Sequence, residues 1–499
     1  MSENSKSKKA LTSALAIGLA AIMTIGGGTF AYLQGETEEV KNDFKRNKVM
    51  VDLVETKGPN FDILPGTTDE KDPKVTVDNT VDAYAYVEIT DATEGLVTYE
   101  LADGWTLLKG TDNIYYREVA ANADVKEFSV LKNDTVTYDA ALANTDMVDA
   151  DGNLKPNVAL TFKASATQKA PFNDPVKAYY QVETVADTPV NLYNSVLQSK
   201  DGDTILVNDD VDLAPIVGRV NGLNFNSKPD EAPKNVTLDL NGHTIKCPLP
   251  WFMYVGENKD SGLTIKNGKI IADKDGFYVY GPSLTFDNVE LVIPNNYGIY
   301  ARTGYNADIT VKDSKITGAN YGVAVWGKDG FQNNVTIENT KIDANYFGVY
   351  QNGQWSPTAY TINNAEISSS EGVGIYIANS SGKAFQTLNL TNSTVSGPTA
   401  VEVKHTNATI TGSTLIATAA DTSAVVSGSG SCTAGYSIAV TSNRADDLAT
   451  GTVTVTDSKL YTGSAEGEPN GKHFVFQPAD GASVTINGTS VTDYGSYAG

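Results

Sequence analysis

The sequence predicts an all-β protein in which a β-sandwich is followed by a parallel β-helix of about ten coils. Short alternating apolar runs separated by turn residues occupy the first part of the chain. One eight-residue pattern returns ten times in the second part. The composition agrees, because 44 Gly and 25 Tyr accompany only 5 Met and 3 His, a profile that favours strands and turns over helices.

Charge and motif content exclude several classes of function. The formal net charge is −23, so nucleic acid is not expected as a partner. The three histidines, His243, His405 and His473, are well separated in the sequence. No HExxH, GxSxG, P-loop or GxGxxG motif stands in a suitable context. We therefore predict no catalytic residue, no cofactor and no metal centre.

Residues 1–32 have the pattern of a secretory signal peptide. Lys6, Lys8 and Lys9 precede an apolar stretch over residues 10–25, and three glycines and small residues follow. The stretch is short for a membrane span. We expect a secreted protein with no membrane segment once the signal is removed.

Residues 33–185 are predicted to form the β-sandwich. The expected strands, each bounded by Gly, Pro, Asn or Asp, are residues 49–54, 74–77, 84–89, 115–119, 158–162 and 178–182. The charged stretch 36–46 is interpreted as a frayed, solvated leader or a short helix.

Part of this region resembles a known family. The residues concerned are GGGTFAYL (26–33), FKRNKVMVDLVE (44–55), ILPG (63–66), VTVDNT (75–80) and AYAYVEI (83–89). The first resembles the SipW-dependent signal type of Gram-positive bacteria, and residues 26–185 resemble the TasA/camelysin family of matrix-fibre proteins. The resemblance implies a jelly-roll-like sandwich, a cell-surface or matrix location, and self-association by strand addition of the leader. Some family members are metallopeptidases, but this segment has no histidine, so that activity is not carried over.

Residues 186–202 are predicted to be a helix that caps the solenoid. Asp187, Thr188 and Pro189 form a helix start, and Val190, Tyr193, Val196 and Leu197 form an apolar stripe. A cap is needed because an open solenoid end exposes unpaired strand edges.

Residues 203–499 carry the repeat apolar-Thr-apolar-x-Asn/Asp-x-x-apolar. The ten copies begin at residues 236, 263, 284, 309, 335, 360, 388, 408, 453 and 484. Alternation places the first, third and eighth residues inward. The fifth, mostly Asn, Asp or Gly, is expected at a sharp corner where positive φ is tolerated. The repeat resembles the right-handed parallel β-helix (pectate-lyase-like) superfamily.

A second repeat marks another strand in each coil. Gly276, Gly298, Gly322, Gly348 and Gly374 precede alternating runs 22 to 26 residues apart, and Ala400 takes the equivalent position in the next coil. The first and third residues after each are expected to face inward, and the second and fourth outward. Cys247 and Cys432 would lie several coils apart, so both thiols are predicted to be unpaired.

The predicted outward stripe supplies the candidate binding residues. They are Tyr278, Tyr280, Tyr300, Arg302, Trp326, Tyr350 and Tyr376, with Trp355 in a nearby loop. Flat rings with polar tips suit sugar faces, and a row of rings suits a long polymer. The alternative is an aromatic ladder that only stabilises neighbouring coils.

Other polar clusters are weaker candidates. Glu402, Lys404 and His405 form the one mixed cluster on the predicted face, and a plain ion pair is the simpler interpretation. The aspartates at 201, 203, 209, 210 and 212 could bind calcium, but a solvated acidic turn is the simpler interpretation.

These features lead to one main functional expectation and two alternatives. The main expectation is a secreted cell-surface or matrix protein whose β-helix is an adhesive, polysaccharide-binding rod. The first alternative is a polysaccharide lyase or glycoside hydrolase acting on the same face, although no adjacent acid pair is evident. The second is a purely structural biofilm matrix filament.

Overall fold

The computed structural model describes residues 46–225, 227–302, 307–326, 331–352, 357–378, 386–419, 425–426, 432–433, 435–440, 451–462 and 482–491. The predicted signal peptide, nearly all of the charged leader, and Trp355 lie outside these residues, as does the side chain of Cys432. The described chain is all-β, as predicted.

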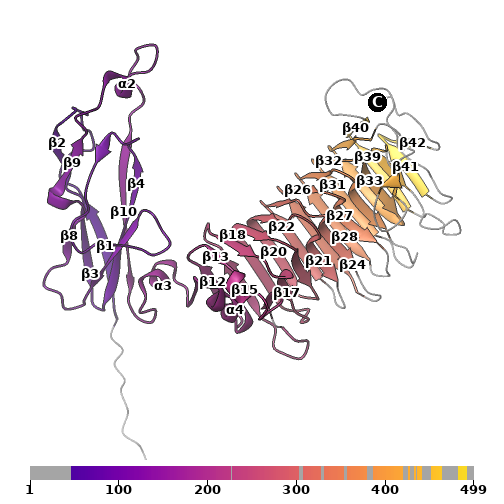
Figure 1. Ribbon diagram of the computed structural model, residues 1–499, viewed down its shortest axis with the longest axis horizontal. Coiled ribbons are helices and arrows are strands. Elements are labelled where there is room, and N and C mark those ends of the chain that lie inside the picture. Colours follow the sequence, from indigo (N-terminus) through magenta and orange to yellow (C-terminus); the bar gives the residue numbers. More distant parts are fainter. Residues whose placement is uncertain are drawn as a thin grey trace, which may run out of the picture. The chain divides into compact units, whose positions relative to one another are not determined.

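The N-terminal region is an antiparallel β-sandwich (Figure 1). One sheet has the order β1 (Val49–Val54), β3 (Lys74–Asn79), β8 (Glu127–Ser129), and another the order β10 (Ala159–Gln168), β4 (Ala83–Ala92), β7 (Ile114–Val119), β6 (Thr106–Leu107). A small third sheet joins β2 (Thr68–Glu70), β9 (Thr135–Tyr138) and β5 (Val97–Thr98). Alternation along β3 and β4 places Val75, Val77, Ala85 and Val87 in one buried core.

The predicted strand over 178–182 is wrong, because the chain forms helix α3 (Pro175–Tyr180) there. The Asp174 carboxylate accepts hydrogen bonds from the backbone N–H groups of Val176 (2.9 Å) and Lys177 (3.0 Å). Pro175 occupies the first turn, where its missing N–H costs nothing. The Asp-Pro pair was a helix start that the apolar alternation obscured.

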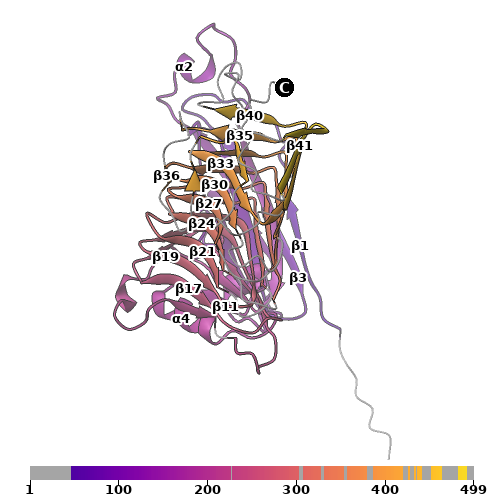
Figure 2. The ribbon, with the colours of Figure 1, turned by 90° about the vertical axis from the view of Figure 1, so that its right-hand side faces the viewer.

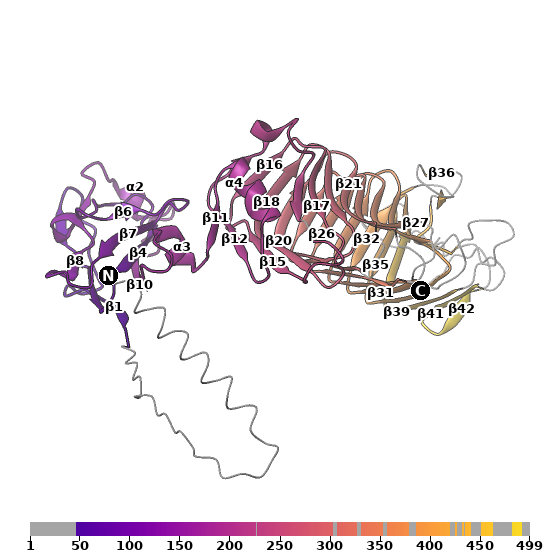
Figure 3. The same cartoon turned by 90° about the horizontal axis from the view of Figure 1, so that it is seen from below.

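The predicted capping helix forms as α4 (Pro189–Leu197), with the Thr188 hydroxyl accepting from the Asn191 N–H at 3.2 Å. Leu192 and Val196 are buried in the solenoid core. In Figure 3, α4 lies beside the first coils. The stacked sheet begins one strand before the helix, because β11 (Thr184–Ala186) pairs in parallel with β12 (Thr204–Val207).

The C-terminal region is a right-handed parallel β-helix with two long parallel walls. The first wall takes two strands from most coils and has the order β11, β12, β13 (Val211–Asp212), β15 (Asn235–Asp239), β16 (Thr244–Cys247), β18 (Gly262–Ala272), β20 (Ser283–Val292), β22 (Ala307–Lys312), β23 (Lys315–Thr317), β25 (Asn333–Glu338), β26 (Lys341–Ala344), β28 (Thr358–Asn363), β29 (Glu366–Ser369), β31 (Gln386–Thr391), β32 (Thr394–Gly397), β34 (Thr406–Thr411), β35 (Thr414–Ala417), β39 (Gly451–Thr456), β40 (Lys459–Thr462), β41 (Ala482–Ile486) and β42 (Thr489–Val491).

The second wall, shown strand above strand in Figure 2, takes one strand from each coil. Its order is β14 (Leu223–Phe225), β17 (Trp251–Val255), β19 (Asp275–Val279), β21 (Tyr297–Arg302), β24 (Tyr321–Trp326), β27 (Phe347–Asn352), β30 (Val373–Ala378), β33 (Thr399–Lys404) and β38 (Ile438–Val440). The two walls enclose the apolar interior.

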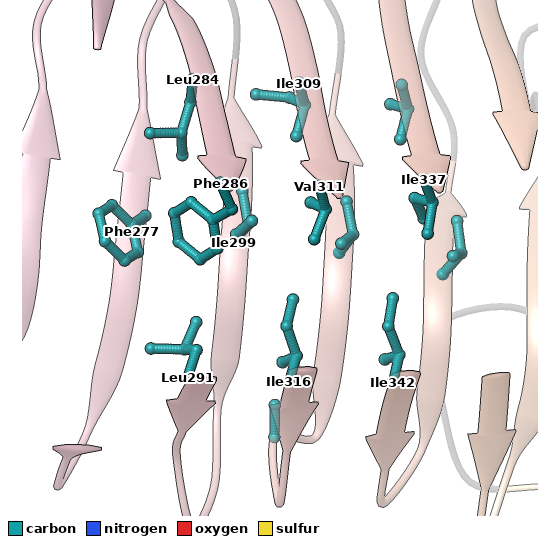
Figure 4. Packing of buried hydrophobic residues seen from close by; sticks show 14 of the residues in the cluster. Phe277, Leu284, Phe286, Leu291, Ile299, Ile309, Val311, Ile316, Ile337 and Ile342 are labelled. Carbon is teal, nitrogen blue, oxygen red and sulfur yellow. The ribbon is translucent and has the colours of Figure 1, made fainter. Parts of the chain in front are cut away.

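The inward positions of the repeat build that interior. Leu284, Phe286 and Leu291 of one coil are fully buried, as are their equivalents Ile309, Val311 and Ile316 in the next. Figure 4 shows these side chains in layers that repeat from coil to coil. The predicted inward register is therefore confirmed across the described coils.

The predicted corners are also confirmed. Nine corner residues, the fifth of each pattern or the sixth in the longer first copy, have φ between 48° and 58°: Asn241, Asn267, Asn288, Asp313, Asn339, Asn364, Asn392, Gly412 and Asp457. Their amides form part of a ladder: Asn364 Nδ2 donates to Asn339 Oδ1 at 2.8 Å, and Asn339 Nδ2 to Asp313 Oδ1 at 3.0 Å. Asn and Asp suit these corners because they tolerate the left-handed region.

The tenth copy, 484–491, is not a coil corner. Its residues form the hairpin of β41 and β42, with Val484 opposite Val491 in antiparallel register. Asn487 and Gly488 both have positive φ, the signature of a two-residue hairpin turn. Figure 3 shows this hairpin at the opposite end of the solenoid from α4.

Cys247 is a free, buried thiol on β16. Burial raises its pKa to about 12, so the thiol is protonated and unreactive at neutral pH. Its role is that of a small core residue.

Candidate carbohydrate-binding face

The outward side chains of the second wall form one column of stacked positions. The register of the parallel strands aligns Tyr254, Tyr278, Tyr300, Ala324, Tyr350, Tyr376 and Glu402 on successive strands. Parallel pairing without slippage places equivalent residues about 4.8 Å apart. The tyrosines predicted to line up therefore do so.

A second column, which the sequence analysis missed, lies beside the first. It contains Tyr297, Tyr321 and Phe347, the residues immediately before the repeated glycines. The glycines are required between the columns, because a Cβ on Gly298 would lie 2.5 Å from the carbonyl oxygen of Gly322. The aromatic residue before each glycine was the available signal.

The outer surface formed by these two columns divides into two parts that differ in solvent exposure. We call the outward residues of β17, β19, β21 and β24 the open half, and those of β27, β30 and β33 the closed half. In the open half Trp251, Tyr254, Tyr278, Tyr280, Tyr297, Tyr300 and Tyr321 are partly exposed, and Arg302 and Trp326 are exposed.

Ring contacts run without interruption through the open half. Ring centroids are 5.7 Å apart for Trp251 and Tyr278 and 5.0 Å apart for Tyr278 and Tyr300. Tyr297 stacks on Tyr300 at 4.5 Å and on Tyr321 at 4.7 Å. Burial raises the pKa values of Tyr297 and Tyr300, so the hydroxyls are neutral donors and acceptors at the edge of a continuous apolar surface.

Arg302 and Trp326 complete the open half. The guanidinium carbon of Arg302 lies 5.0 Å from the centroid of the Trp326 ring, and Arg302 Nη1 donates to the Tyr278 hydroxyl at 3.3 Å. The Tyr280 hydroxyl donates to the same oxygen at 3.4 Å. Four predicted residues from three successive strands are thus brought into one contact network.

The closed half does not have the exposure that was expected for it. Tyr350 is 8% exposed and Tyr376 is fully buried. Both belong to an apolar cluster outside the solenoid interior, together with Ala324, Phe347 and Val373. Tyr300 and Tyr321 of the open half border this cluster, and Ala419 packs against it. Outward direction therefore does not mean solvent exposure here, and neither ring can stack on a sugar in this structure.

The cluster Glu402, Lys404 and His405 is not a solvent-facing acid–base site. Lys404 Nζ lies 3.3 Å from Glu402 Oε1, and both side chains are essentially buried. Lys404 also lies 5.1 Å from the Tyr376 ring centroid. His405 has a φ of 54° after the end of β33. The ion pair expected from the sequence is present, but inside the closed half.

Asp275 is the carboxylate of β19 at the open half. Its Oδ1 accepts a hydrogen bond from the Tyr297 N–H at 3.2 Å. Burial raises the pKa of this carboxyl above its usual range. A partly buried acid beside aromatic rings is a feature of glycosidase acids, but that chemistry needs a second carboxylate at a suitable distance.

The aspartates that were considered for calcium binding accept hydrogen bonds from backbone N–H groups, within turns and between neighbouring coils. Asp201 Oδ1 accepts from the Asn235 N–H, Asp210 Oδ1 from the Thr244 N–H, and Asp212 Oδ1 from the Ala214 N–H. Within the described ranges no group of three or more His, Cys, Asp or Glu side chains is arranged to hold a metal ion. Nor does any helix of the described residues have the length and apolar character to cross a membrane.

No protein-family model matches the chain, and no curated protein does. Similar solved structures include the Agl-KA catalytic domain, with a TM-score of 0.24 and 11% identity over 88% of this chain and 96% of that one. Another is the catalytic domain of a GH87 alpha-1,3-glucanase in complex with tetrasaccharides, with a TM-score of 0.25 and 12% identity over 87% and 98%. At these TM-scores the likeness carries no argument, and the TasA/camelysin resemblance of residues 26–185 stays a prediction.

Proposed function

We propose that the chain is a polysaccharide-binding protein that acts through the open half of the β-helix wall. The observation that carries this proposal is the unbroken row of partly exposed rings, 4.5 to 5.7 Å between centroids, over four successive strands. Aromatic faces bind the apolar faces of sugars, while hydroxyls at the ring edges bind sugar hydroxyls. A row along the stacking direction suits an extended polymer.

The setting of this face is part of the same proposal. The signal-like segment 1–32 and the TasA-like features of residues 26–185 support export to the surface or matrix of a Gram-positive bacterium. The sandwich would then attach or self-associate, with the leader adding as a strand to a neighbour. The β-helix would present the open half to the polysaccharide.

Cleavage is the second candidate, and Asp275 is the observation that favours it. Burial keeps this carboxyl more readily protonated than an ordinary aspartate, as a general acid requires. Adhesion ranks first because the row of rings supports it directly, whereas the second carboxylate at the open half, Glu257, accepts a hydrogen bond from Tyr254 at 3.3 Å and no contact among the described residues joins it to Asp275. A purely structural filament ranks third, since the rings of the open half would then need no exposure.

One experiment separates these functions. The protein is incubated with a panel of neutral and acidic polysaccharides. Retention in affinity electrophoresis without new reducing ends or unsaturated products supports the binding protein. Cleavage that is lost in Asp275→Asn supports the enzyme instead.

Variants show whether the open half is responsible. The double variant Tyr278→Ala with Tyr300→Ala is expected to weaken retention at least about tenfold, since each stacking contact contributes on the order of 1 kcal/mol. Tyr461→Ala, which removes a partly exposed tyrosine of β40 on the other wall, is the matched control and should retain binding. Unchanged retention in the double variant would refute the proposal.

A further inference from the structure

Arg302 is the exposed cation of the open half, and two neighbours hold it in place. It ends β21, its guanidinium lies over the Trp326 ring at 5.0 Å, and its Nη1 donates to the Tyr278 hydroxyl at 3.3 Å. A stacked and hydrogen-bonded guanidinium loses little further conformational freedom when a ligand binds. The side chain is therefore preorganised while still open to solvent.

No carboxylate of the described residues pairs with Arg302, in contrast to cations elsewhere on the solenoid. On the first wall, Lys266, Lys269 and Lys312 lie 3.2, 3.0 and 2.8 Å from an Asp or Glu oxygen. The pKa of Arg302 is raised chiefly by its hydrogen bond to Tyr278. The guanidinium has five N–H donors, one of them is used in this contact, and the side chain is exposed, so it can offer donors to a ligand.

We infer that the open half prefers glycans that carry an oxyanion, a carboxylate or a sulfate, on the sugar. This inference rests on the proposed polysaccharide binding and names its substrate class. The planar N–H fork of an arginine binds carboxylate and sulfate oxygens in pairs, and such charge-assisted bonds are stronger than neutral ones. Sugars would stack on Tyr278, Tyr300 and Trp326 while Arg302 binds the anionic substituent.

The net charge of −23 does not decide against this preference. At about 0.15 M salt the screening length is about 8 Å, so the chain's distant carboxylates act weakly at Arg302. Of the carboxylates at the open half, Glu257 accepts a hydrogen bond from the Tyr254 hydroxyl at 3.3 Å and Asp275 from the Tyr297 N–H at 3.2 Å, so neither is the partner of Arg302.

The test uses polymers that differ only in charge. A polyuronate, the same polymer with its carboxyl groups reduced to alcohols, and a sulfated derivative of that neutral polymer are titrated into the full chain at about 0.15 M salt. The anionic polymers are expected to bind on the order of tenfold more tightly than the neutral one, the factor that one charge-assisted hydrogen bond supplies. Which anionic polymer binds better identifies the oxyanion.

Variants assign the preference to Arg302. Arg302→Gln should remove the tenfold difference, so that the variant binds the charged and the neutral polymers with about equal affinity. Tyr278→Phe keeps the ring but removes the hydroxyl that holds the guanidinium, and should reduce the difference only in part. Lys459→Gln, on β40 of the first wall, is the matched loss of one positive charge and should change nothing.

Two outcomes contradict different claims. Equal binding of charged and neutral polymers, or a preference that survives Arg302→Gln, overturns this inference and leaves the proposed function standing. Failure of all three polymers to bind the folded chain, with circular dichroism unchanged, overturns the proposed function as well.

Discussion

The open and closed halves of the second wall place aromatic residues at the same register positions, but the rings of the open half are partly exposed to solvent and those of the closed half are buried. Tyr300 and Tyr376 are equivalent residues three strands apart, with Ala324 and Tyr350 between them, yet Tyr300 reaches solvent and Tyr376 is fully buried. The chemistry follows the surroundings, because the open half leaves Arg302 exposed whereas the closed half buries Glu402 and Lys404.

The direction in which a side chain points and its exposure to solvent are two separate properties. Strand alternation decides whether a side chain points into the solenoid or away from it. Solvent exposure depends in addition on what packs against the outer surface, such as Ala419 against the closed half. The closed half is therefore a small second core, and the open half is the part available to a ligand.

The largest expected effect is on stability at the closed half. Tyr376→Ala should lower the free energy of unfolding by about 3–5 kcal/mol, since it removes a fully buried ring. Tyr300→Ala should lower it by less than about half as much, because part of that ring is already in water. Urea unfolding followed by circular dichroism measures both. Equal losses would remove the distinction between the halves.

The buried ion pair gives the next effect. Glu402→Gln removes the carboxylate beside buried Lys404 and should lower the free energy of unfolding by about 3 kcal/mol. The control Lys341→Gln breaks the exposed Lys341–Glu366 pair of the first wall and should change it by less than about 1 kcal/mol. A small effect at Glu402 would mean that water reaches the closed half.

Corner residues should not distinguish the halves at all. Asn267 and Asn364 belong to coils of the open and closed halves, and both have positive φ, 58° and 50°. Replacing either with Ala should lower the free energy of unfolding by about 1–2 kcal/mol, because Ala lacks the ladder amide and disfavours this backbone region. If the two variants lose different amounts of stability, the open and closed halves differ throughout their coils and not only on the outer face.

The smallest effect is a pH-dependent one in the open half. The pKa of Asp275 is raised in the folded state, so its ionised form opposes folding at neutral pH. Asp275→Asn should therefore raise the melting temperature by a few degrees at pH 7. The gain should shrink as the pH falls through the raised pKa, and vanish below about 3.9, the usual value for an unfolded aspartate. A lower melting temperature at pH 7 would show that the Tyr297 N–H bond to the carboxylate outweighs burial.

Some elements of the fold could be predicted from the sequence and others could not. The corner asparagines and inward triplets were predictable because each requirement is local and repeats with every coil. Helix α3 was missed because an apolar run outweighed the Asp174–Pro175 start. The 484–491 hairpin was missed because its residues match the coil pattern, although Asn487-Gly488 is also a two-residue hairpin turn. The second aromatic column could have been predicted from the aromatic residue before each glycine, but the prediction used only the residues after each glycine.

The all-β class, the capping helix and the alignment of equivalent residues in each coil could be predicted from the amino-acid pattern, because repeated apolar periodicity leaves one register that buries every inward side chain. Which of the aligned residues meet solvent could be seen only in the folded molecule. Exposure depends on contacts between segments far apart in the chain, and no local pattern at Tyr300 or Tyr376 encodes them. The candidate site is therefore the open half alone, from Trp251 to Trp326.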